Sequence, residues 1–348
     1  MQNENPWDKE VFIIAEMSAN HANDINIAIK TIEAAAKAGA NAIKTQLFTA
    51  ESLGIPDRKK SPLIEDKSSP WFQEKLYDLY NNASMPYEWY PRLKKCAELN
   101  NIILFGSVFD TASVDFALKN KFNFIKISSF EIIHEPLLRK VASKGIPSII
   151  STGMATLTEI EKAHNIFREQ DCIHCFLKCT SNYPASIEDT HIRLMKTIND
   201  RFKVPVGLSD HSLSNLPSVM AVALGGRIIE KHIILDKNIE SVDNFFSLDK
   251  NEFQNLVEDI RNAEKLIKKT TFDQLPSPSE MHSHWERPSI YYSRILNKGE
   301  ILKESDLIIR RPSLGLKPEE LKNIIGKKIN RTVEQYQATS IQDFEQNN

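Results

Sequence analysis

Charged and polar side chains occupy positions where the sequence otherwise predicts buried strands. They stand toward the carboxyl ends of several apolar runs, at Glu16, Lys44, Gln46, Lys126, Lys178, Ser209, Asp210, His211, Glu230 and His232. Both faces of a parallel barrel strand are buried, so its residues should be mostly apolar. Buried charge is costly unless it is paired or used, so its repetition at one end of several strands indicates a functional site. A structural ion-pair network is the alternative, but it does not account for the histidines.

Two histidines fall on neighbouring predicted strands. His211 ends the seventh strand and His232 lies on the eighth, so their imidazoles are expected at similar height. The two-residue period of a strand places Ser209 on the face of His211 and Glu230 on the face of His232. Two imidazoles with nearby carboxylates suit a divalent first-row metal that keeps positions open for substrate oxygen. Either histidine alone is more simply a hydrogen-bonded core residue, but the pair favours a metal.

Strand lysines are expected to converge with several serines. The residues concerned are Lys44, Lys126, Lys178, Ser107, Ser129, Ser151 and Ser181. Ammonium and hydroxyl donors gathered in this way would form a local cradle for phosphate and carboxylate groups. Each serine alone is more simply a loop residue, so the prediction depends on the lysines. The formal net charge of -2 provides no basic excess for a nucleic-acid partner.

The cysteines admit two interpretations. Cys172, Cys175 and Cys179 lie close to His174 in the sequence, which is compatible with zinc. Cys175 and Cys179, however, fall within an apolar run that is typical of a strand, so we interpret the group as small buried thiols. With 4 cysteines in 348 residues, a disulfide framework is not expected.

These side chains would be positioned by a regular alternation of strands and helices. The predicted strands are Val11–Met17, Ala42–Leu47, Ile102–Phe109, Phe124–Ser128, Pro147–Ser151, His174–Cys179, Val204–Leu208 and Ile228–Ile234. The predicted helices include Ile25–Ala38 (ending at Gly39), Tyr87–Leu99, Glu159–Arg168, Glu188–Asn199 and Asn251–Ile267. Eight alternating units predict a (β/α)8 TIM barrel, whose active site lies at the carboxyl ends of the strands. An open doubly wound sheet is the alternative, but it usually carries an early glycine fingerprint that this sequence lacks.

The chain is longer than a barrel alone requires. We assign residues 1–270 to the barrel, 271–286 to a turn-rich linker and 287–348 to a small β-rich domain. The last segment contains short predicted strands at Ser289–Arg294 and Ser305–Arg310. A domain of this size has little core of its own, so it should lean on the barrel or on a second subunit.

The sequence gives no indication of a membrane partner or of secretion. The segment Met1–Glu10 lacks the basic-then-apolar layout of a signal peptide. No apolar run reaches the ~18 residues that a membrane helix needs. We therefore expect the protein in the cytoplasm.

Seven motifs, in order along nearly the whole chain, resemble those of the sialic acid synthase family. They are Ile14–His21, Ala38–Gln46, Lys126–Glu131, Ser151–Met154, Lys178–Pro184, Gly207–Ser212 and Glu230–His232. The first, in its Glu-Met-Ser-Ala-Asn-His form, is most similar to the pseudaminic acid synthases. Each motif alone is weak, but seven in the right order at strand ends are specific.

This resemblance implies an architecture and a set of residue roles. The barrel would be followed by an antifreeze-like (SAF) domain, in a domain-swapped homodimer where Arg311 of each small domain caps the partner's site. His211 and His232 would bind a divalent metal, usually Mn2+ with Mg2+ or Co2+ as alternatives, and Glu16 would be the acid/base. Phosphoenolpyruvate would be held by Lys44, Ser107, Lys126, Ser129, Ser151, Ser181 and Ser209. The sugar would be held by Gln46, Tyr183, Asp243 and Arg311.

The implied reaction joins phosphoenolpyruvate to an amino-sugar aldehyde, giving a nine-carbon sugar acid and phosphate. The implied sugar is 2,4-diacetamido-2,4,6-trideoxy-L-altropyranose, the precursor of pseudaminic acid. N-acetylneuraminate or legionaminate synthesis is the alternative within the family, and a saccharide-binding protein with an inactive barrel is the alternative outside it. Departures from the family pattern bear on the sugar: Ala22-Asn23-Asp24 after the first strand, a glycine-free loop before Asp243, and Val108 after Ser107.

Overall fold

The computed structural model describes residues 7, 9–67, 69–269, 271 and 274–345. The chain forms two compact units, Met1–Lys268 and Lys269–Asn348. Parts of two predicted segments lie outside the described residues: positions 1–6 and 8 of the polar N-terminus, and positions 270, 272 and 273 around the start of the linker. Each unit is described by itself.

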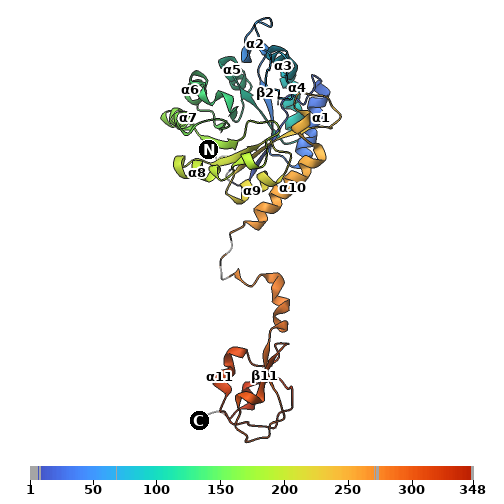
Figure 1. The fold of residues 1–348 in the computed structure, drawn as a ribbon, viewed down its shortest axis with the longest axis vertical. Helices are drawn as coiled ribbons and strands as arrows, with labels where there is room; N and C mark the ends of the chain where they lie inside the picture. Colours follow the sequence, from blue (N-terminus) through green and yellow to red (C-terminus); the bar gives the residue numbers. More distant parts are fainter. Residues whose placement is uncertain (1–6, 8, 68, 270, 272–273, 346–348) are drawn as a thin grey trace. The chain divides into compact units, whose positions relative to one another are not determined.

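The first unit is a closed parallel barrel surrounded by helices (Figure 1). Its strands are β1 Phe12–Glu16, β2 Ala42–Leu47, β3 Ile103–Val108, β4 Ile125–Ile127, β5 Ser148–Ser151, β6 His174–Cys179, β7 Val206–Asp210 and β8 Ile228–Ile234. Each strand pairs with the next, and β1 also pairs with β8, which closes the sheet. A short strand β9, Leu248–Asp249, pairs in parallel with the last two residues of β8. The predicted eight-stranded barrel is confirmed.

The seventh strand differs most from its predicted range. It begins at Val206 rather than Val204, because Pro205 has no N–H to donate to the sheet and contributes only its carbonyl, which accepts from Phe176 N at 3.1 Å. It also continues through Ser209 to Asp210, so His211 follows the strand directly.

Helices cover the outside of the barrel (Figure 1). They are α1 Ile25–Ala38, α2 Ala50–Leu53, α3 Leu76–Ala83, α4 Tyr90–Leu99, α5 Thr111–Lys119, α6 Glu135–Ser143, α7 Leu157–Glu169, α8 Leu194–Phe202, α9 Leu216–Ala223 and α10 Lys250–Leu266. The predicted helix Glu188–Asn199 is wrong in its bounds, because Glu188–Thr190 forms a 3-10 helix and α8 begins only at Leu194 and runs to Phe202. The first helix has its predicted bounds, and its ends show why. Asp24 caps its start by accepting from Asn26 N at 2.7 Å, and Gly39 ends it in the left-handed region at φ 92°.

The barrel interior changes from apolar to polar along the strands. Phe12, Phe105 and Phe124 fill the amino-terminal part, with the Phe105 and Phe124 ring centroids 4.4 Å apart. Glu16 lies four residues after Phe12, and Lys126 lies two residues after Phe124. An even spacing keeps each charged residue on the same face of the strand as its phenylalanine. The aromatic layer therefore closes one end of the barrel and leaves the charged residues at the other.

The second unit is a small β-rich domain with its own apolar core. Strands β10 (Ser289–Tyr292) and β11 (Leu307–Arg310) pair antiparallel, and the short helix α11 spans Leu321–Ile324. A 3-10 helix at Pro278–Glu286 precedes them. The core side chains are Ile290, Tyr292, Leu296, Leu302, Ile324, Ile329, Val333 and Phe344. Across both units, no helix of the described residues is long and apolar enough to cross a membrane.

Candidate active site

A cavity of about 440 Å3 opens at the carboxyl ends of the barrel strands. It is lined by side chains from the strand ends and from the loops that follow them. The predicted residues among them are Glu16, Lys44, Gln46, Ser107, Lys126, Ser129, Ser151, Tyr183, Ser209, His211, His232 and Asp243. The barrel thus gathers, from separate parts of the chain, nearly all of the predicted residues of the first unit.

Glu230 joins two lysines inside this cavity. Lys44 Nζ donates to Glu230 Oε2 at 2.6 Å, and Lys126 Nζ donates to Glu230 Oε1 at 3.2 Å. Ser209 Oγ donates to the same Oε1 at 2.8 Å. Burial raises the pKa of Glu230, but Lys126 and Lys44 outweigh it and bring the pKa below its ordinary value. An ionised Glu230 therefore holds both ammonium groups in place.

Glu16 is the second carboxyl group of the cavity. Gln46 Nε2 donates to Glu16 Oε1 at 3.2 Å, and Lys44 Nζ lies 3.1 Å from Glu16 Oε2. The lysine contact lacks hydrogen-bond geometry, so Oε2 has no hydrogen-bond partner among the described residues. Burial raises the pKa of Glu16 to about 7 against the attraction of Lys44, and Glu230 adds to the rise. A carboxyl group with this pKa can both accept and release a proton near neutral pH.

The imidazoles of His211 and His232 lie side by side, with ring centroids 5.3 Å apart. His211 Nδ1 is 2.9 Å from the Thr180 carbonyl oxygen, so a proton on Nδ1 leaves Nε2 with its lone pair. His232 Nδ1 is buried without a hydrogen-bond partner among the described residues, and Asp243 Oδ2 is 4.0 Å away. Burial lowers the pKa of His232 well below its ordinary value, which keeps this imidazole neutral, as a metal ligand must be.

These two histidines fit a divalent metal that takes its remaining ligands from outside the protein. The described residues contain no group of three or more His, Cys, Asp or Glu side chains placed to hold a metal ion. A metal on His211 and His232 would therefore need oxygen ligands from water or substrate. That is the open coordination expected of a catalytic rather than a structural ion.

Packing fixes the orientation of the two rings. The Tyr183 and His211 ring centroids are 4.4 Å apart, and those of Phe246 and His232 are 4.6 Å apart. Cys179 Sγ lies 3.8 Å from His211 Nδ1. Burial raises the pKa of Cys179, but the attraction of His211 and a hydrogen bond from it lower the pKa to about 6. The same pairing outweighs burial and raises the pKa of His211.

The hydroxyl groups of Ser129 and Ser181, which follow β4 and β6, lie close together at Gly153, and Ser151 ends β5. Gly153 N–H donates to Ser129 Oγ at 3.0 Å. A Cβ at position 153 would lie 2.2 Å from Ser181 Oγ and 2.8 Å from Ser129 Oγ, so glycine is needed for this approach. Ser151 Oγ is buried with no hydrogen-bond partner among the described residues, which leaves it available to a ligand oxygen.

Lys178 does not join the predicted cradle. Its Nζ donates to the Cys179 carbonyl oxygen at 2.9 Å and to Thr180 Oγ1 at 2.7 Å. Cys179, the next residue on β6, lines the cavity, whereas Lys178 does not. Neighbouring residues on a strand face opposite ways, so the prediction of three converging lysines is wrong. Ser181 lies beside the cavity rather than in its lining, with Oγ 3.9 Å from Cys179 Sγ.

The remaining predicted residues lie elsewhere. Arg311 belongs to the second unit, where it is exposed immediately after β11. The cysteines are buried, as predicted, and Cys172 Sγ donates to the Ile146 carbonyl oxygen at 3.3 Å. His174 Nε2 lies 2.9 Å from His164 Nδ1. The Cys172 thiol and the His174 imidazole therefore do not share a ligand position, and His174 Nδ1 lies 3.0 Å from the Cys172 carbonyl oxygen.

The aromatic part of the cavity wall has no clear signal in the sequence. Trp71 comes from the long segment between β2 and α3, and its Nε1–H donates to the Val242 carbonyl oxygen at 3.2 Å. Its ring centroid lies 5.9 Å from that of Phe245 and 6.2 Å from that of Tyr183. Trp71 and Phe246 both line the cavity. The segment carrying Trp71 lacks strand or helix periodicity, so nothing in its pattern predicts that it reaches the barrel mouth.

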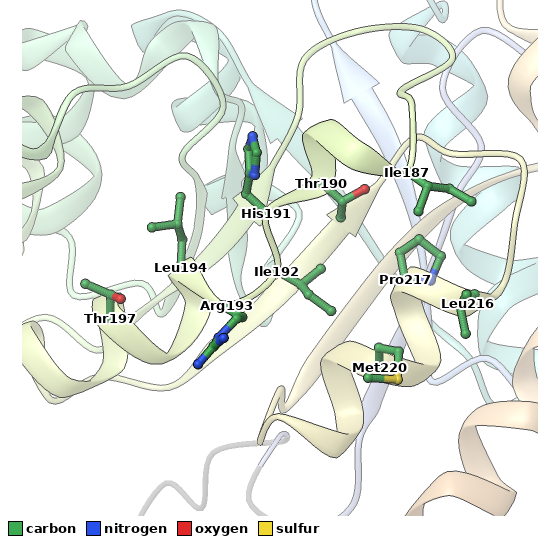
Figure 2. Close-up of a pocket in the computed structure, with 10 residues that line it drawn as sticks. All are labelled: Ile187, Thr190, His191, Ile192, Arg193, Leu194, Thr197, Leu216, Pro217 and Met220. Carbon is green, nitrogen blue, oxygen red and sulfur yellow. The ribbon is translucent and has the colours of Figure 1, made fainter.

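A second cavity, of about 540 Å3, lies outside the barrel mouth, between α8 and the start of α9 (Figure 2). Its lining is mainly apolar, with Ile187, Ile192, Leu194, Leu216, Pro217 and Met220. Arg193 is its one guanidinium among the described residues, and no carboxylate lines it there. This second cavity has none of the paired charges that catalysis needs, so we place the active site at the barrel mouth.

Comparison with known proteins supports this assignment. The model of the NeuB family matches residues 31–271, and that of the SAF domain matches residues 287–335. A pseudaminic acid synthase of Campylobacter jejuni is 43% identical over 340 residues, covering 97% of each chain. An N,N'-diacetyllegionaminic acid synthase of Legionella pneumophila is 35% identical, covering 91% of this chain and 90% of its own.

Solved structures agree with these matches. The N-acetylneuraminic acid (sialic acid) synthetase of Leptospira borgpetersenii, crystallised with citrate, superposes with a TM-score of 0.70 at 30% identity, over 79% of this chain and 90% of its own. A spore coat polysaccharide biosynthesis protein of Bacillus subtilis gives 0.64 at 28% identity, over 98% and 97%. With its closed barrel, its SAF domain and its cavity of predicted residues, the chain belongs to the NeuB family of sialic acid synthase-type enzymes.

Proposed function

We propose that this enzyme condenses phosphoenolpyruvate with 2,4-diacetamido-2,4,6-trideoxy-L-altropyranose to give pseudaminic acid and phosphate. The observation that carries the proposal is the gathering of Glu16, Lys44, Lys126, His211 and His232 in one cavity. The choice of sugar is supported by the 43% identity to a pseudaminic acid synthase over nearly the whole chain.

Phosphoenolpyruvate brings a phosphate and a carboxylate, and the cavity contains donors suited to both. Lys44 and Lys126 are buried cations held by Glu230, and Ser151 Oγ is an unpartnered buried hydroxyl. Charge-assisted hydrogen bonds from these groups would orient the anion. The proposed holding set is Lys44, Ser107, Lys126, Ser129, Ser151, Ser181 and Ser209.

Carbon 3 of phosphoenolpyruvate would attack the aldehyde carbon of the open-chain sugar. Water would then add at carbon 2, and phosphate would leave by cleavage of the C–O bond. The two substrates and one water molecule thus give the sugar acid and phosphate. Glu16 is suited to transfer the proton that these steps require, because its pKa is about 7 and its Oε2 has no hydrogen-bond partner among the described residues.

A divalent metal, Mn2+ or alternatively Mg2+ or Co2+, would supply Lewis-acid polarisation of the sugar carbonyl when bound. The chain's contribution is to present the imidazoles of His211 and His232 in fixed orientations. The hydrogen bond from His211 Nδ1 to the Thr180 carbonyl oxygen sets one tautomer. Burial keeps His232 neutral.

The sugar would be held by Gln46, Tyr183 and Asp243, beside an aromatic wall that includes Trp71. We further propose that Arg311 completes the site of a partner subunit in a domain-swapped homodimer. This is supported by its exposed position at the end of β11 in the small second unit. We place the reaction in the cytoplasm, in keeping with a chain whose cysteines are free thiols.

The test is phosphate release by the purified protein with Mn2+, phosphoenolpyruvate and one of three sugars. The sugars are the L-altro diacetamido compound, the precursor of diacetyllegionaminic acid and N-acetylmannosamine. Release should depend on metal and on a sugar, with the highest kcat/KM for the first. A preference for either of the others would assign the enzyme to legionaminate or N-acetylneuraminate synthesis. Saccharide binding without phosphate release would indicate a binding protein.

A further inference from the structure

A buried ion pair lies on the outer face of the strands that carry the two histidines. Asp210 on β7 and Lys231 on β8 are register partners, directly after Ser209 and Glu230, which line the cavity. Because residues alternate along a strand, Asp210 and Lys231 point away from the cavity. Both are almost completely buried, at 3% and 1% exposure. Full charges on this face are unusual, because it normally packs against apolar helix residues.

The ammonium group of Lys231 binds the loop that follows His211. Its Nζ donates to Asp210 Oδ2 at 2.8 Å, to the Ser212 carbonyl oxygen at 2.5 Å and to the Ser214 carbonyl oxygen at 3.1 Å. The Ser212 hydroxyl adds a fourth, longer contact at 3.4 Å, so the acceptors satisfy all three N–H groups of the ammonium. One side chain from β8 thus fixes two peptide groups of the loop between β7 and α9.

Asp210 secures the same loop from the other side. Its Oδ1 accepts from Ser212 N at 2.9 Å, and its Oδ2 accepts from Ser218 Oγ on α9 at 2.7 Å. His211 stands between Asp210 and Ser212, so both of its chain neighbours are held by this network. Its own carbonyl accepts from Ala185 N at 3.0 Å.

We infer that Asp210 and Lys231 are positioning residues that set the height and orientation of the His211 imidazole for metal binding. A pair of this kind can often be replaced by uncharged residues without loss of stability, so stability alone gives little reason to retain it. The geometry gives a reason, since Lys231 lies next to His232 in the sequence while clamping the loop of His211. One residue therefore links the backbones of both histidines. This inference rests on the proposed metal site.

The test is the affinity of the metal-free, full-length protein for Mn2+, measured from the free-ion electron paramagnetic resonance signal. In Asp210→Asn/Lys231→Met the buried charges disappear together, Asn retains an oxygen for Ser212 N, and Met retains the length of the lysine stem. We expect Mn2+ affinity to fall by about 10- to 100-fold, as for other residues that orient metal ligands. Ile260→Ala is the matched control for lost stability, because it creates a cavity on the fully buried face of α10. This variant should keep the wild-type affinity for Mn2+.

The outcomes separate this inference from the proposed function. If the double variant binds Mn2+ as the wild type does, or if Ile260→Ala weakens binding equally, the positioning role is overturned while the metal site stands. If His232→Ala leaves Mn2+ binding unchanged, the site itself is misplaced and both fail. Should the double variant not fold, Ser218→Ala removes one contact of Asp210 and should still weaken Mn2+ binding measurably; unchanged affinity in that variant would also overturn the inference.

Discussion

Two buried carboxyl groups in one cavity have opposite protonation behaviour. Glu230 has a lowered pKa because the attraction of Lys126 and Lys44 outweighs its burial. Glu16 has a pKa raised to about 7, because burial, with Glu230 adding to it, outweighs the attraction of Lys44 and Lys126. Environments that push two carboxyl groups apart in this way separate their roles. Glu230 is suited to hold the lysines, and Glu16 to move a proton.

Replacing Glu16 by Gln tests whether Glu16 is the carboxyl group that moves a proton. The amide keeps the size of the side chain but cannot take up a proton, so turnover should fall ~100-fold or more. Mn2+ affinity and the melting temperature should stay near wild type. Near-normal turnover by Glu16→Gln would remove this residue from the mechanism.

Gly153 provides a second test at the residue scale. Alanine would place a Cβ 2.2 Å from Ser181 Oγ and 2.8 Å from Ser129 Oγ, so both hydroxyls would have to move. We expect KM for phosphoenolpyruvate to rise by about tenfold, with a smaller change in the KM for the sugar, because displacing hydrogen-bond donors costs on the order of 1.5 kcal/mol. Gly145→Ala is the control for lost stability, since a Cβ there meets no atom within 4 Å and its φ of +65° places the strain in the backbone, at a residue that does not line the cavity. Equal effects of the two substitutions would argue against a role of these hydroxyls in anion binding.

At the scale of elements, the sequence predicts where the strands lie, but it does not always predict which of their side chains face the cavity. Each strand is a short, mostly apolar run that carries at least one polar or charged residue. The sequence also shows the residues that cap α1, Asp24 at its start and Gly39 at its end. In β6, however, the flanking residues are apolar on both faces, so alternation could not show which way Lys178 points. The position of Trp71 depends on a long segment whose path is set by tertiary contacts such as that with Val242.

The packing of β6 against α7 predicts a pH dependence of stability. His174 is buried beside His164, and burial lowers the pKa of His174 from 6.5 to about 4. In the unfolded chain the His174 imidazole therefore binds a proton more readily than in the folded protein. The contribution of neutral His174 to the free energy of unfolding is fully present above pH 6.5 and is lost as the pH falls toward 4. The loss amounts to ~3 kcal/mol at most.

Urea unfolding between pH 7 and pH 4 measures this effect. The free energy of unfolding should decrease as the pH falls, and His174→Phe should remove part of the slope. His21, whose pKa burial also lowers to about 4, should account for a further part. His191→Phe, at an exposed position without a buried imidazole, is the control. If His174→Phe and the wild type have the same slope, His174 is not the group that titrates.

At the scale of the whole molecule, the cavity in the first unit and Arg311 in the second belong to separately folded parts. The sequence predicts the existence of both parts from the change in composition near residue 270, and the second has its own small core. It does not predict whether Arg311 acts at a barrel, or at which one, because no local pattern determines that.

Mixing two inactive variants tests the proposed exchange of Arg311. Glu16→Gln has a defective barrel and an intact Arg311, whereas Arg311→Ala has the reverse. If each small domain serves the partner's barrel, random subunit exchange between equal amounts should restore about a quarter of wild-type activity, since half the dimers would contain one intact site out of two. No recovery after proven exchange would mean that Arg311 acts on its own barrel or not at all. Lys317→Ala, another exposed cation of the second unit, should retain activity.

The most direct test of the proposed active site is a crystal structure of the full-length protein with Mn2+ and phosphoenolpyruvate. Anomalous diffraction would be recorded at the manganese edge. The anomalous peak should lie between the imidazoles of His211 and His232, and the phosphate should contact Lys44 or Lys126 together with Ser151 Oγ. A manganese peak elsewhere on the chain, or phosphoenolpyruvate bound away from the lysines joined by Glu230, would contradict the proposed site.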